Sequence, residues 1–234
     1  MYQGRKCIAV IVSGGRGARF GGDIPKQYLE IGGKPVLAFS LLAFESCEFV
    51  DEIRIVASVG YIELCERMAQ EYGISKFSEV RRGGESRQES VYAGIFDVSD
   101  DDIILIHDSA RPFVTTEQIR GLIPFAATGA VISAAPVTDT IKVTANNQTQ
   151  HTPDRSTLYA AQTPQGFLGT IIKKAHITAK NDGFIGSDDA SLVERIGINC
   201  AILPSDAANI KITTKNDFEF ARFITEAKQP QNKR

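Results

Sequence analysis

Short apolar runs alternate with amphipathic segments along most of the chain. The first run, CIAVIV at residues 7–12, is rich in β-branched side chains, which is typical of a strand buried on both faces. Similar runs predict strands at 52–58, 78–82, 101–108, 129–137 and 199–204. Helical periodicity predicts helices at 36–47, 61–73, 115–126, 168–180, 188–196 and 216–228, and one more helix after the glycines at 83–84.

This alternation predicts a single α/β domain over residues 1–234, with a mostly parallel sheet and helices on both faces. Parallel strands need crossover connections, and helical crossovers cover the sheet. Ligands are therefore expected at the carboxyl ends of the strands. The segment 206–213 is compatible with either a strand or an edge loop, and the tail at 228–234 is expected to be frayed.

The alternation of predicted strands and helices is interrupted at residues 138–159. Only Ile141 and Val143 alternate with polar residues there, and Asn146-Asn147 is a turn signal. A two-stranded arm with so little apolar surface is not stable alone, so we expect it to pack on a partner subunit.

Composition narrows the function classes. The 26 basic and 28 acidic residues give a net charge of −2, which argues against nucleic acid held by a broad basic surface. The four cysteines have no zinc-type spacing and are interpreted as small hydrophobic residues in a reducing cytosol. Apolar runs stay well below the roughly 18 residues that span a bilayer, and the amino terminus leads directly into the first strand. We expect a cytoplasmic protein with no membrane partner.

A glycine-rich loop follows the first strand, in VSGGRGARFGGDIPKQY at residues 12–28. Its spacing fits neither a Walker A loop nor the dinucleotide fingerprint, because Phe20 stands where the third glycine would be. An ordinary strand-to-helix turn would also use glycines. However, Arg19 and Lys26 beside exposed backbone N–H groups favour a site for a triphosphate-sized anion.

The motif HDSARPF at residues 107–113 ends the strand at 101–108. Asp108 is either a ligand for Mg²⁺ at the mouth of the sheet or a cap for the following turn, and the motif alone leaves both open. Arg111 offers a second contact for an anion. His107 is interpreted as structural, since Asp108 and Arg111 account for the site without it.

Six motifs occur in the order found in one enzyme family: GGRGARFGGDIPKQY, GGESRQESVYAG, HDSARPF, APVTDTIK, DRSTLYAAQTPQGF and NIKIT. The chain therefore resembles the 2-C-methyl-D-erythritol 4-phosphate cytidylyltransferases over about residues 8–223. The resemblance implies a Rossmann-like nucleotidyltransferase fold with a protruding β-arm and a homodimer joined through that arm. It also implies transfer of CMP from CTP to a sugar-alcohol phosphate with Mg²⁺ or another divalent cation. Related enzymes use ribitol 5-phosphate.

The resemblance also implies roles for individual residues. The implied catalytic residues, which bind the triphosphate and stabilise the transition state, are Arg19, Lys26 and Lys211. The implied nucleotide-binding residues are Ser13, Gly14, Gly15, Gly17, Gly84, Glu85 and Ser90. The implied acceptor-binding residues are Arg111, Thr140, Arg155 and Thr163, of which Thr140 and Arg155 would reach the partner's site. Asp108 is the implied metal ligand.

The leading hypothesis is a cytidylyltransferase that makes CDP-methylerythritol and pyrophosphate by direct in-line attack. The first alternative is a ribitol-5-phosphate cytidylyltransferase. The second is a nucleotide-binding module without catalytic activity.

Overall fold

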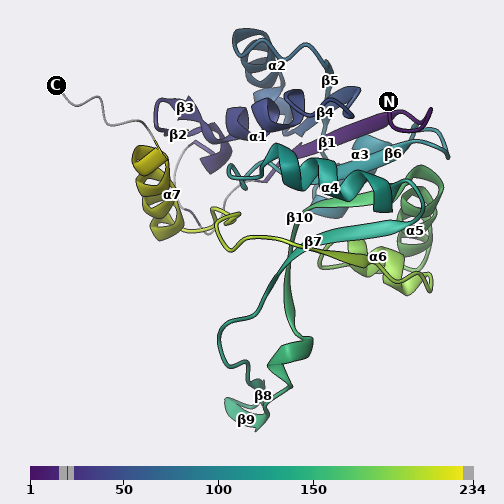
Figure 1. Ribbon diagram of the computed structural model, residues 1–234, viewed down its shortest axis with the longest axis vertical. Helices are drawn as coiled ribbons and strands as arrows, with labels where there is room; N and C mark the ends of the chain where they lie inside the picture. The colour runs from purple at the N-terminus through teal and green to yellow at the C-terminus, as the bar shows by residue number, and fades with distance from the viewer. Residues whose placement is uncertain (16–19, 21–23, 229–234) are drawn as a thin grey trace.

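The computed structural model describes residues 1–15, 20 and 24–228. Its centre is a seven-stranded sheet with the order β11-β7-β10-β6-β1-β4-β5 (Figure 1). The strands are β1 (Cys7–Ser13), β4 (Glu52–Ala57), β5 (Phe77–Arg82), β6 (Ile103–Asp108), β7 (Ala130–Pro136), β10 (Tyr159–Leu168) and β11 (Ala201–Pro204). The helices are α1 (Val36–Glu45), α2 (Ile62–Glu71), α3 (Arg87–Ile95), α4 (Thr116–Ala126), α5 (Gly169–Asn181), α6 (Asp189–Arg195) and α7 (Lys215–Lys228). The predicted α/β fold with a mostly parallel sheet is confirmed.

Helices cover both faces of the sheet, as the strand patterns predict. Side chains of β1 alternate: Cys7, Ala9 and Ile11 join a core with α1, α2 and α4, whereas Ile8 and Val10 join a second core with α3, α5 and α6. Both sides of the strand are therefore buried, which explains its unbroken apolar sequence. No helix in the described part of the chain is long and apolar enough to cross a membrane.

The strand β10 is the main element that the sequence analysis missed. It is ten residues long and runs antiparallel to both neighbours, β6 and β7, in the middle of the sheet. Its central residues include Gln162, Thr163 and Gln165, which are polar yet buried. Each makes a hydrogen bond to a residue that is distant in the chain: Gln162 to Ser205, Thr163 to His107 and Gln165 to Asp188. Polar residues at interior positions resemble a loop in sequence, because their partners lie far away in the chain.

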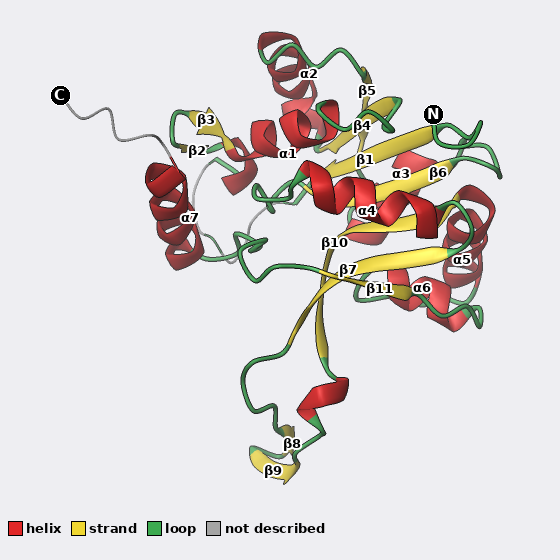
Figure 2. Ribbon diagram, in the orientation of Figure 1, coloured by secondary structure: helices red, strands yellow, loops and turns green. Residues whose placement is uncertain are grey.

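The predicted arm is present. It carries β8 (Val143–Ala145) and β9 (Gln148–His151), joined through Asn146 and Asn147 with φ of 51° and 59°, and it projects away from the sheet (Figure 2). All residues of both strands are exposed. The packing of this arm on a second subunit remains a prediction.

A small subassembly stands beside the sheet. The hairpin β2 (Glu30–Ile31) and β3 (Lys34–Pro35) packs with α7 through a cluster that includes Ile31, Ile212 and Ala221. The segment 206–213 is a loop rather than a strand, and the N–H of Ile212 donates to the carbonyl of Ala110 at 2.9 Å. This bond fixes the neighbouring Lys211 close to the end of β6. The predicted fraying of the tail falls almost entirely on residues 229–234, outside the described residues.

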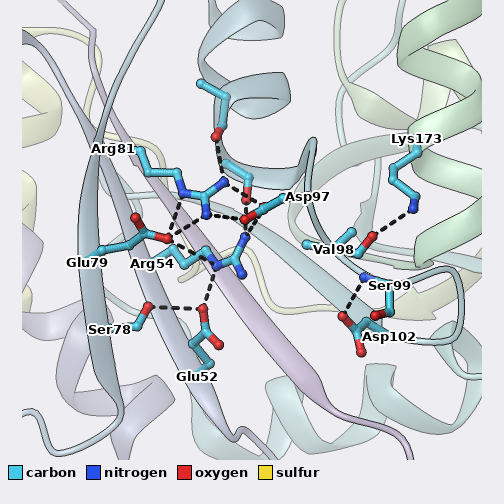
Figure 3. A network of polar contacts seen from close by, with 12 residues as sticks. Glu52, Arg54, Ser78, Glu79, Arg81, Asp97, Val98, Ser99, Asp102 and Lys173 are labelled. Atoms are coloured by element: carbon cyan, nitrogen blue, oxygen red, sulfur yellow. Dashed lines mark hydrogen bonds and ion pairs between the residues drawn. The ribbon is translucent and has the colours of Figure 1, made fainter.

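An ion-pair network holds the carboxyl end of α3 against the sheet (Figure 3). Asp97 follows α3 and accepts from Arg54 of β4 and from Arg81 of β5, at 2.7 Å and 2.6 Å. Arg54 also pairs with Glu52, and Arg81 with Glu79. Because these contacts fix the carboxyl end of α3, its amino end has a defined place beside the carboxyl ends of the parallel strands.

Candidate active site

Four neighbouring parallel strands end at one edge of the sheet. Val12 of β1 is in register with Asp108 of β6, and Ala57 of β4 is in register with Ser13 on one side and Arg82 on the other. The loops that follow these strands enclose a cleft of about 960 Å³. The cleft lies where ligands bind in open α/β sheets.

Many residues that the sequence singled out line this cleft. They are Gly14, Gly15, Lys26, Gly84, Glu85, Ser90, Asp108 and Lys211. Arg19 and Gly17 lie outside the described residues, so their predicted roles remain predictions. The cleft thus brings together the start of the glycine loop, the expected base-reading loop, the expected metal ligand and two lysines.

The glycine loop is anchored at its start by two buried side chains. Nε2 of Gln27 donates to the carbonyl oxygens of Ser13 and Gly15, at 2.8 Å and 3.1 Å. The hydroxyl of Tyr28 lies 3.2 Å from both the hydroxyl and the carbonyl of Ser13. Burial raises the pKa of Tyr28, so it stays neutral. The side chain of Ser13 is thereby turned into the protein, and Ser13 is not among the described residues that line the cleft, so its predicted contact with the nucleotide remains a prediction.

The expected base-reading loop is shaped by the first turn of α3. Ser86 caps the helix and forms a capping box with Glu89, whose carboxylate also accepts from the N–H of Glu85 at 2.7 Å. A Cβ on Gly84 would lie 2.3 Å from Cβ of Glu89, so this position has room only for glycine. The hydroxyl of Ser90 accepts from the N–H of Gly84 and donates to the carbonyl of Ser86. The loop therefore has one defined shape.

Asp108 lies between two cations. Its Oδ1 accepts from Nε of Arg87 at 2.9 Å, and its Oδ2 accepts from Nζ of Lys211 at 2.6 Å. Burial alone would raise the pKa of Asp108, but the charges and hydrogen bonds of Arg87 and Lys211 outweigh burial and hold it well below its usual range. The carboxylate is ionised at neutral pH. The ion pair with Lys211 is a direct link between β6 and the 206–213 loop.

His107 has the structural place expected of it. The ring is fully buried, with Nε2 3.1 Å from the carbonyl of Arg111 and Nδ1 3.2 Å from the hydroxyl of Thr163. A carbonyl can only accept, so Nε2 carries the proton and Nδ1 accepts from Thr163. Burial lowers the pKa of His107 to about 4, which keeps it neutral at pH 7. The hydroxyl of Thr163 also accepts from the N–H of Asp108 at 3.0 Å.

The predicted acceptor-binding residues are not among the described residues that line the cleft. Thr163 is buried behind Asp108, and Arg111 donates to the carbonyl of Asn209 at 2.7 Å. Burial lowers the pKa of Arg111, partly offset by the charge of Asp108. Thr140 and Arg155 lie on the exposed arm, where Arg155 donates to the carbonyl of Thr138. Their predicted contact with a partner's site remains a prediction.

A divalent cation fits this cleft only together with a phosphorylated ligand. The described residues contain no group of three or more acidic, histidine or cysteine side chains arranged so that it could hold a metal ion. Asp108 is the carboxylate at the mouth of β6, and its two oxygens accept from Arg87 and Lys211. Mg²⁺ is commonly held by one or two carboxylates together with substrate phosphates and water, so the donor set of this cleft is compatible with it.

Sequence reasoning missed several residues of the cleft. Gln27 and Arg87 stand inside two of the six motifs, but the sequence analysis assigns a role to neither of them. Arg82, at the carboxyl end of β5, also borders the cleft, and its position at a strand end is a signal that could have indicated it. Asp189, which contacts Arg87 but is not among the described residues that line the cleft, carries no local signal, because Arg87 is 102 positions away in the chain.

Comparisons with known proteins agree with this geometry. Residues 7–227 match the sequence profile of the family IspD: 2-C-methyl-D-erythritol 4-phosphate cytidylyltransferase. The enzyme of that name from Halalkalibacterium halodurans is 42% identical over 221 residues, which cover 94% of this chain and 97% of the relative. The one from Caldanaerobacter subterraneus subsp. tengcongensis is 45% identical over 220 residues, covering 92% and 97%.

Solved structures give the same result. The crystal structure of 4-diphosphocytidyl-2C-methyl-D-erythritol synthase from Anaerococcus prevotii superposes with a TM-score of 0.83 at 26% identity, covering 95% of this chain and 96% of that one. The Francisella tularensis 2-C-methyl-D-erythritol 4-phosphate cytidylyltransferase superposes with a TM-score of 0.78 at 30% identity, covering 93% and 99%. The chain belongs to the 2-C-methyl-D-erythritol 4-phosphate cytidylyltransferase family.

Proposed function

We propose that this protein transfers CMP from CTP to 2-C-methyl-D-erythritol 4-phosphate, which yields CDP-methylerythritol and pyrophosphate. The observation that carries the proposal is one cleft lined by Lys26, Lys211, Asp108 and the glycine-shaped loop at Gly84. Family membership over nearly the whole chain supports the same reaction.

The main obstacle to this reaction is electrostatic. CTP carries about four negative charges and the acceptor phosphate about two, and each unit pair at roughly 5 Å repels by about 3 kcal/mol at an effective dielectric constant near 20. Cations around the reacting phosphates offset this repulsion and stabilise charge that develops on the leaving pyrophosphate. Lys26 and Lys211, with Arg19 as the predicted third, supply that charge.

The acceptor needs no general base. Its phosphate oxygen is already ionised near neutral pH, so it can attack the α-phosphorus directly once the two are aligned. The bond from the α-phosphorus to the bridging oxygen breaks, and pyrophosphate leaves with the electron pair. His107 is buried, neutral and engaged in hydrogen bonds on both nitrogens, which agrees with a reaction that needs no histidine base.

Asp108 is proposed to help hold Mg²⁺ or another divalent cation that arrives with CTP. When bound, such an ion neutralises charge on the triphosphate and orients it. The protein's own part is to hold the Asp108 carboxylate ionised and fixed at the end of β6.

The protein is further proposed to act as a homodimer in the cytoplasm. The exposed arm carries Thr140 and Arg155 away from the cleft of its own chain, and a partner's cleft would give both residues a substrate to contact. An arm whose two strands are wholly exposed also gains burial by packing on a second subunit.

A paired acceptor assay tests the reaction and the substrate together. Purified protein, CTP and Mg²⁺ are incubated with 2-C-methyl-D-erythritol 4-phosphate or with ribitol 5-phosphate, and pyrophosphate release is measured. Faster release with the methylerythritol substrate is expected. Preference for ribitol 5-phosphate would replace the proposed substrate, and no release with either would indicate a nucleotide-binding module.

A further inference from the structure

A line of alternating charges runs from the cleft into the protein interior. Arg87 bridges two carboxylates: Nε donates to Asp108 at 2.9 Å, and Nη1 donates to Asp189 at 2.8 Å. Asp189 also faces Nε2 of His176 at 3.2 Å. The side chain of Asp189 is only 1% exposed, and it is not among the described residues that line the cleft. Its contact with a residue of the cleft runs through Arg87.

The position of Asp189 is rigidly determined. It is the first residue of α6, and the residues on either side of it are both held by Gln165 of β10. Nε2 of Gln165 donates to Asp188 at 2.7 Å, and Oε1 accepts from the N–H of Ala190 at 3.1 Å. This arrangement fixes the Asp189 carboxylate opposite the amino end of α3, where Arg87 begins the helix.

The charges of this line balance. Asp108 and Asp189 contribute two negative charges, and Arg87 and Lys211 contribute two positive charges. Burial would lower the pKa of Arg87, but the two carboxylates outweigh burial and raise it, so the guanidinium is always charged. Without Asp189, Arg87 would direct its full charge at Asp108. That carboxylate would then attract a divalent cation less strongly, because a nearby positive charge repels the incoming ion.

We propose that Asp189 is a positioning residue for the reaction, which neutralises and orients Arg87 so that Asp108 can attract the divalent cation that accompanies CTP. Arg87 contacts Asp108 through Nε while Asp189 holds Nη1, so the guanidinium cannot turn to present two nitrogens to Asp108. Lys211, which donates to Oδ2 of Asp108, is the cation that is able to exchange with the incoming ion. Its side chain ends in a single ammonium group and is 36% exposed. This inference rests on the proposed metal-binding role of Asp108.

Calorimetric titration of CTP without an acceptor tests the inference, because no turnover occurs. The measured quantity is the ratio of CTP dissociation constants without and with saturating Mg²⁺. The Asp189→Asn variant keeps the shape of the side chain and removes its charge, and we expect its ratio to fall at least five-fold below that of the wild type. The matched control is Asp182→Asn, which removes a carboxylate from an arginine pair on the surface and should leave the ratio unchanged.

A double variant, Arg87→Gln with Asp189→Asn, removes one charge of each sign. It is expected to bring the ratio back to within about two-fold of the wild type, because the balance of charges near Asp108 is restored. This variant also tests the inference if Asp189→Asn alone fails to fold, since it leaves no unpaired arginine. Circular dichroism checks the fold of each variant.

The outcomes separate the inference from its premise. A wild-type affinity that does not respond to Mg²⁺ would contradict the proposed role of Asp108 and this inference with it. If the wild-type affinity does respond to Mg²⁺, two results would overturn the inference alone. One is a folded Asp189→Asn variant whose ratio equals that of the wild type, and the other is a double variant whose ratio is at least five-fold below it. Neither result would bear on whether CMP is transferred.

Discussion

The side chain of Gln27 holds the backbone of Ser13 at the point where β1 enters the glycine loop. Its Nε2 lies 2.8 Å from the Ser13 carbonyl and 3.1 Å from the Gly15 carbonyl, and Gln27 is only 3% exposed. One amide thus satisfies two carbonyl groups of a loop that must keep its shape to receive phosphates.

Replacement of this amide should loosen the loop. The Gln27→Leu variant removes the amide donor from both carbonyls, and the Ser13 carbonyl keeps its contact with the Tyr28 hydroxyl. We therefore expect a loss of about 2 kcal/mol in unfolding free energy and a rise in the KM for CTP of about ten-fold. Urea unfolding and steady-state kinetics measure the two effects. The exposed Gln70 of α2 provides the control, since Gln70→Leu should change neither value. An unchanged KM for Gln27→Leu would show that the loop keeps its shape without this amide.

His107 makes stability depend on pH. Burial lowers its pKa in the folded protein to about 4, whereas the unfolded chain has a value near 6.5. Between these values the unfolded state binds the proton and the folded state does not, so stability is full above about pH 6.5 and falls as the pH drops towards 4. The difference amounts to about 3 kcal/mol.

The test is the pH dependence of the unfolding free energy between pH 7 and pH 4. The His107→Gln variant should show a shallower decline than the wild type over this window. His151, exposed on the arm, is the control, and His151→Gln should leave the wild-type slope unchanged. The same steep slope in His107→Gln would mean that another group is responsible.

The Asp97 network should stabilise the fold without taking part in the chemistry. Asp97→Asn weakens the pairing of Arg54, whose side chain is 8% exposed. We expect a loss of about 1 to 2 kcal/mol, since Asp97 itself is partly exposed to solvent. Thermal unfolding should detect this loss, while kcat stays within about two-fold of the wild type. Glu48→Gln breaks an ion pair that is half exposed on both sides, and it should cost less. An equal loss of stability in Asp97→Asn and Glu48→Gln would contradict the claim that burial strengthens the Asp97 network.

Mixed dimers test the proposed contribution of the arm. Arg155→Ala and Lys26→Ala subunits, each of which we expect to be inactive alone, are mixed after partial unfolding and then refolded. If the arm serves the partner's site, half of the dimers carry one intact site, and activity recovers to about a quarter of the wild type. Lys26→Ala mixed with Lys211→Met is the control, because both lysines line the cleft of the same chain and no intact site can form. Equal recovery of activity in both mixtures would show that the arm does not contribute to the partner's site.

The sequence predicted the parts of the site that depend on local order. Asp108 and the glycine loop follow apolar strands, and parallel strands place their carboxyl ends at one edge, so the meeting of these two loops could be expected. The turn at Asn146-Asn147 was likewise predictable, because left-handed backbone in a hairpin favours asparagine.

Contacts between distant parts of the chain could not be predicted in this way. The pair of Arg87 and the buried Asp189 depends on the meeting of the amino ends of α3 and α6, and neither residue has a local pattern that indicates a charged partner. The strand β10 was missed for the same reason, since the side chains of Gln162 and Gln165 bond to groups that lie far away in the chain, on Ser205 and Ala190.

The central claim is that cations around Asp108 bring two phosphorylated substrates together for CMP transfer. Its most direct test is pyrophosphate release from CTP and 2-C-methyl-D-erythritol 4-phosphate by the Lys211→Met variant, compared with the wild type and with Lys215→Met on the exposed start of α7. We expect kcat of Lys211→Met to fall by at least about 100-fold, with an unchanged circular dichroism spectrum and a wild-type kcat for Lys215→Met. A folded Lys211→Met enzyme with wild-type kcat would contradict the claim.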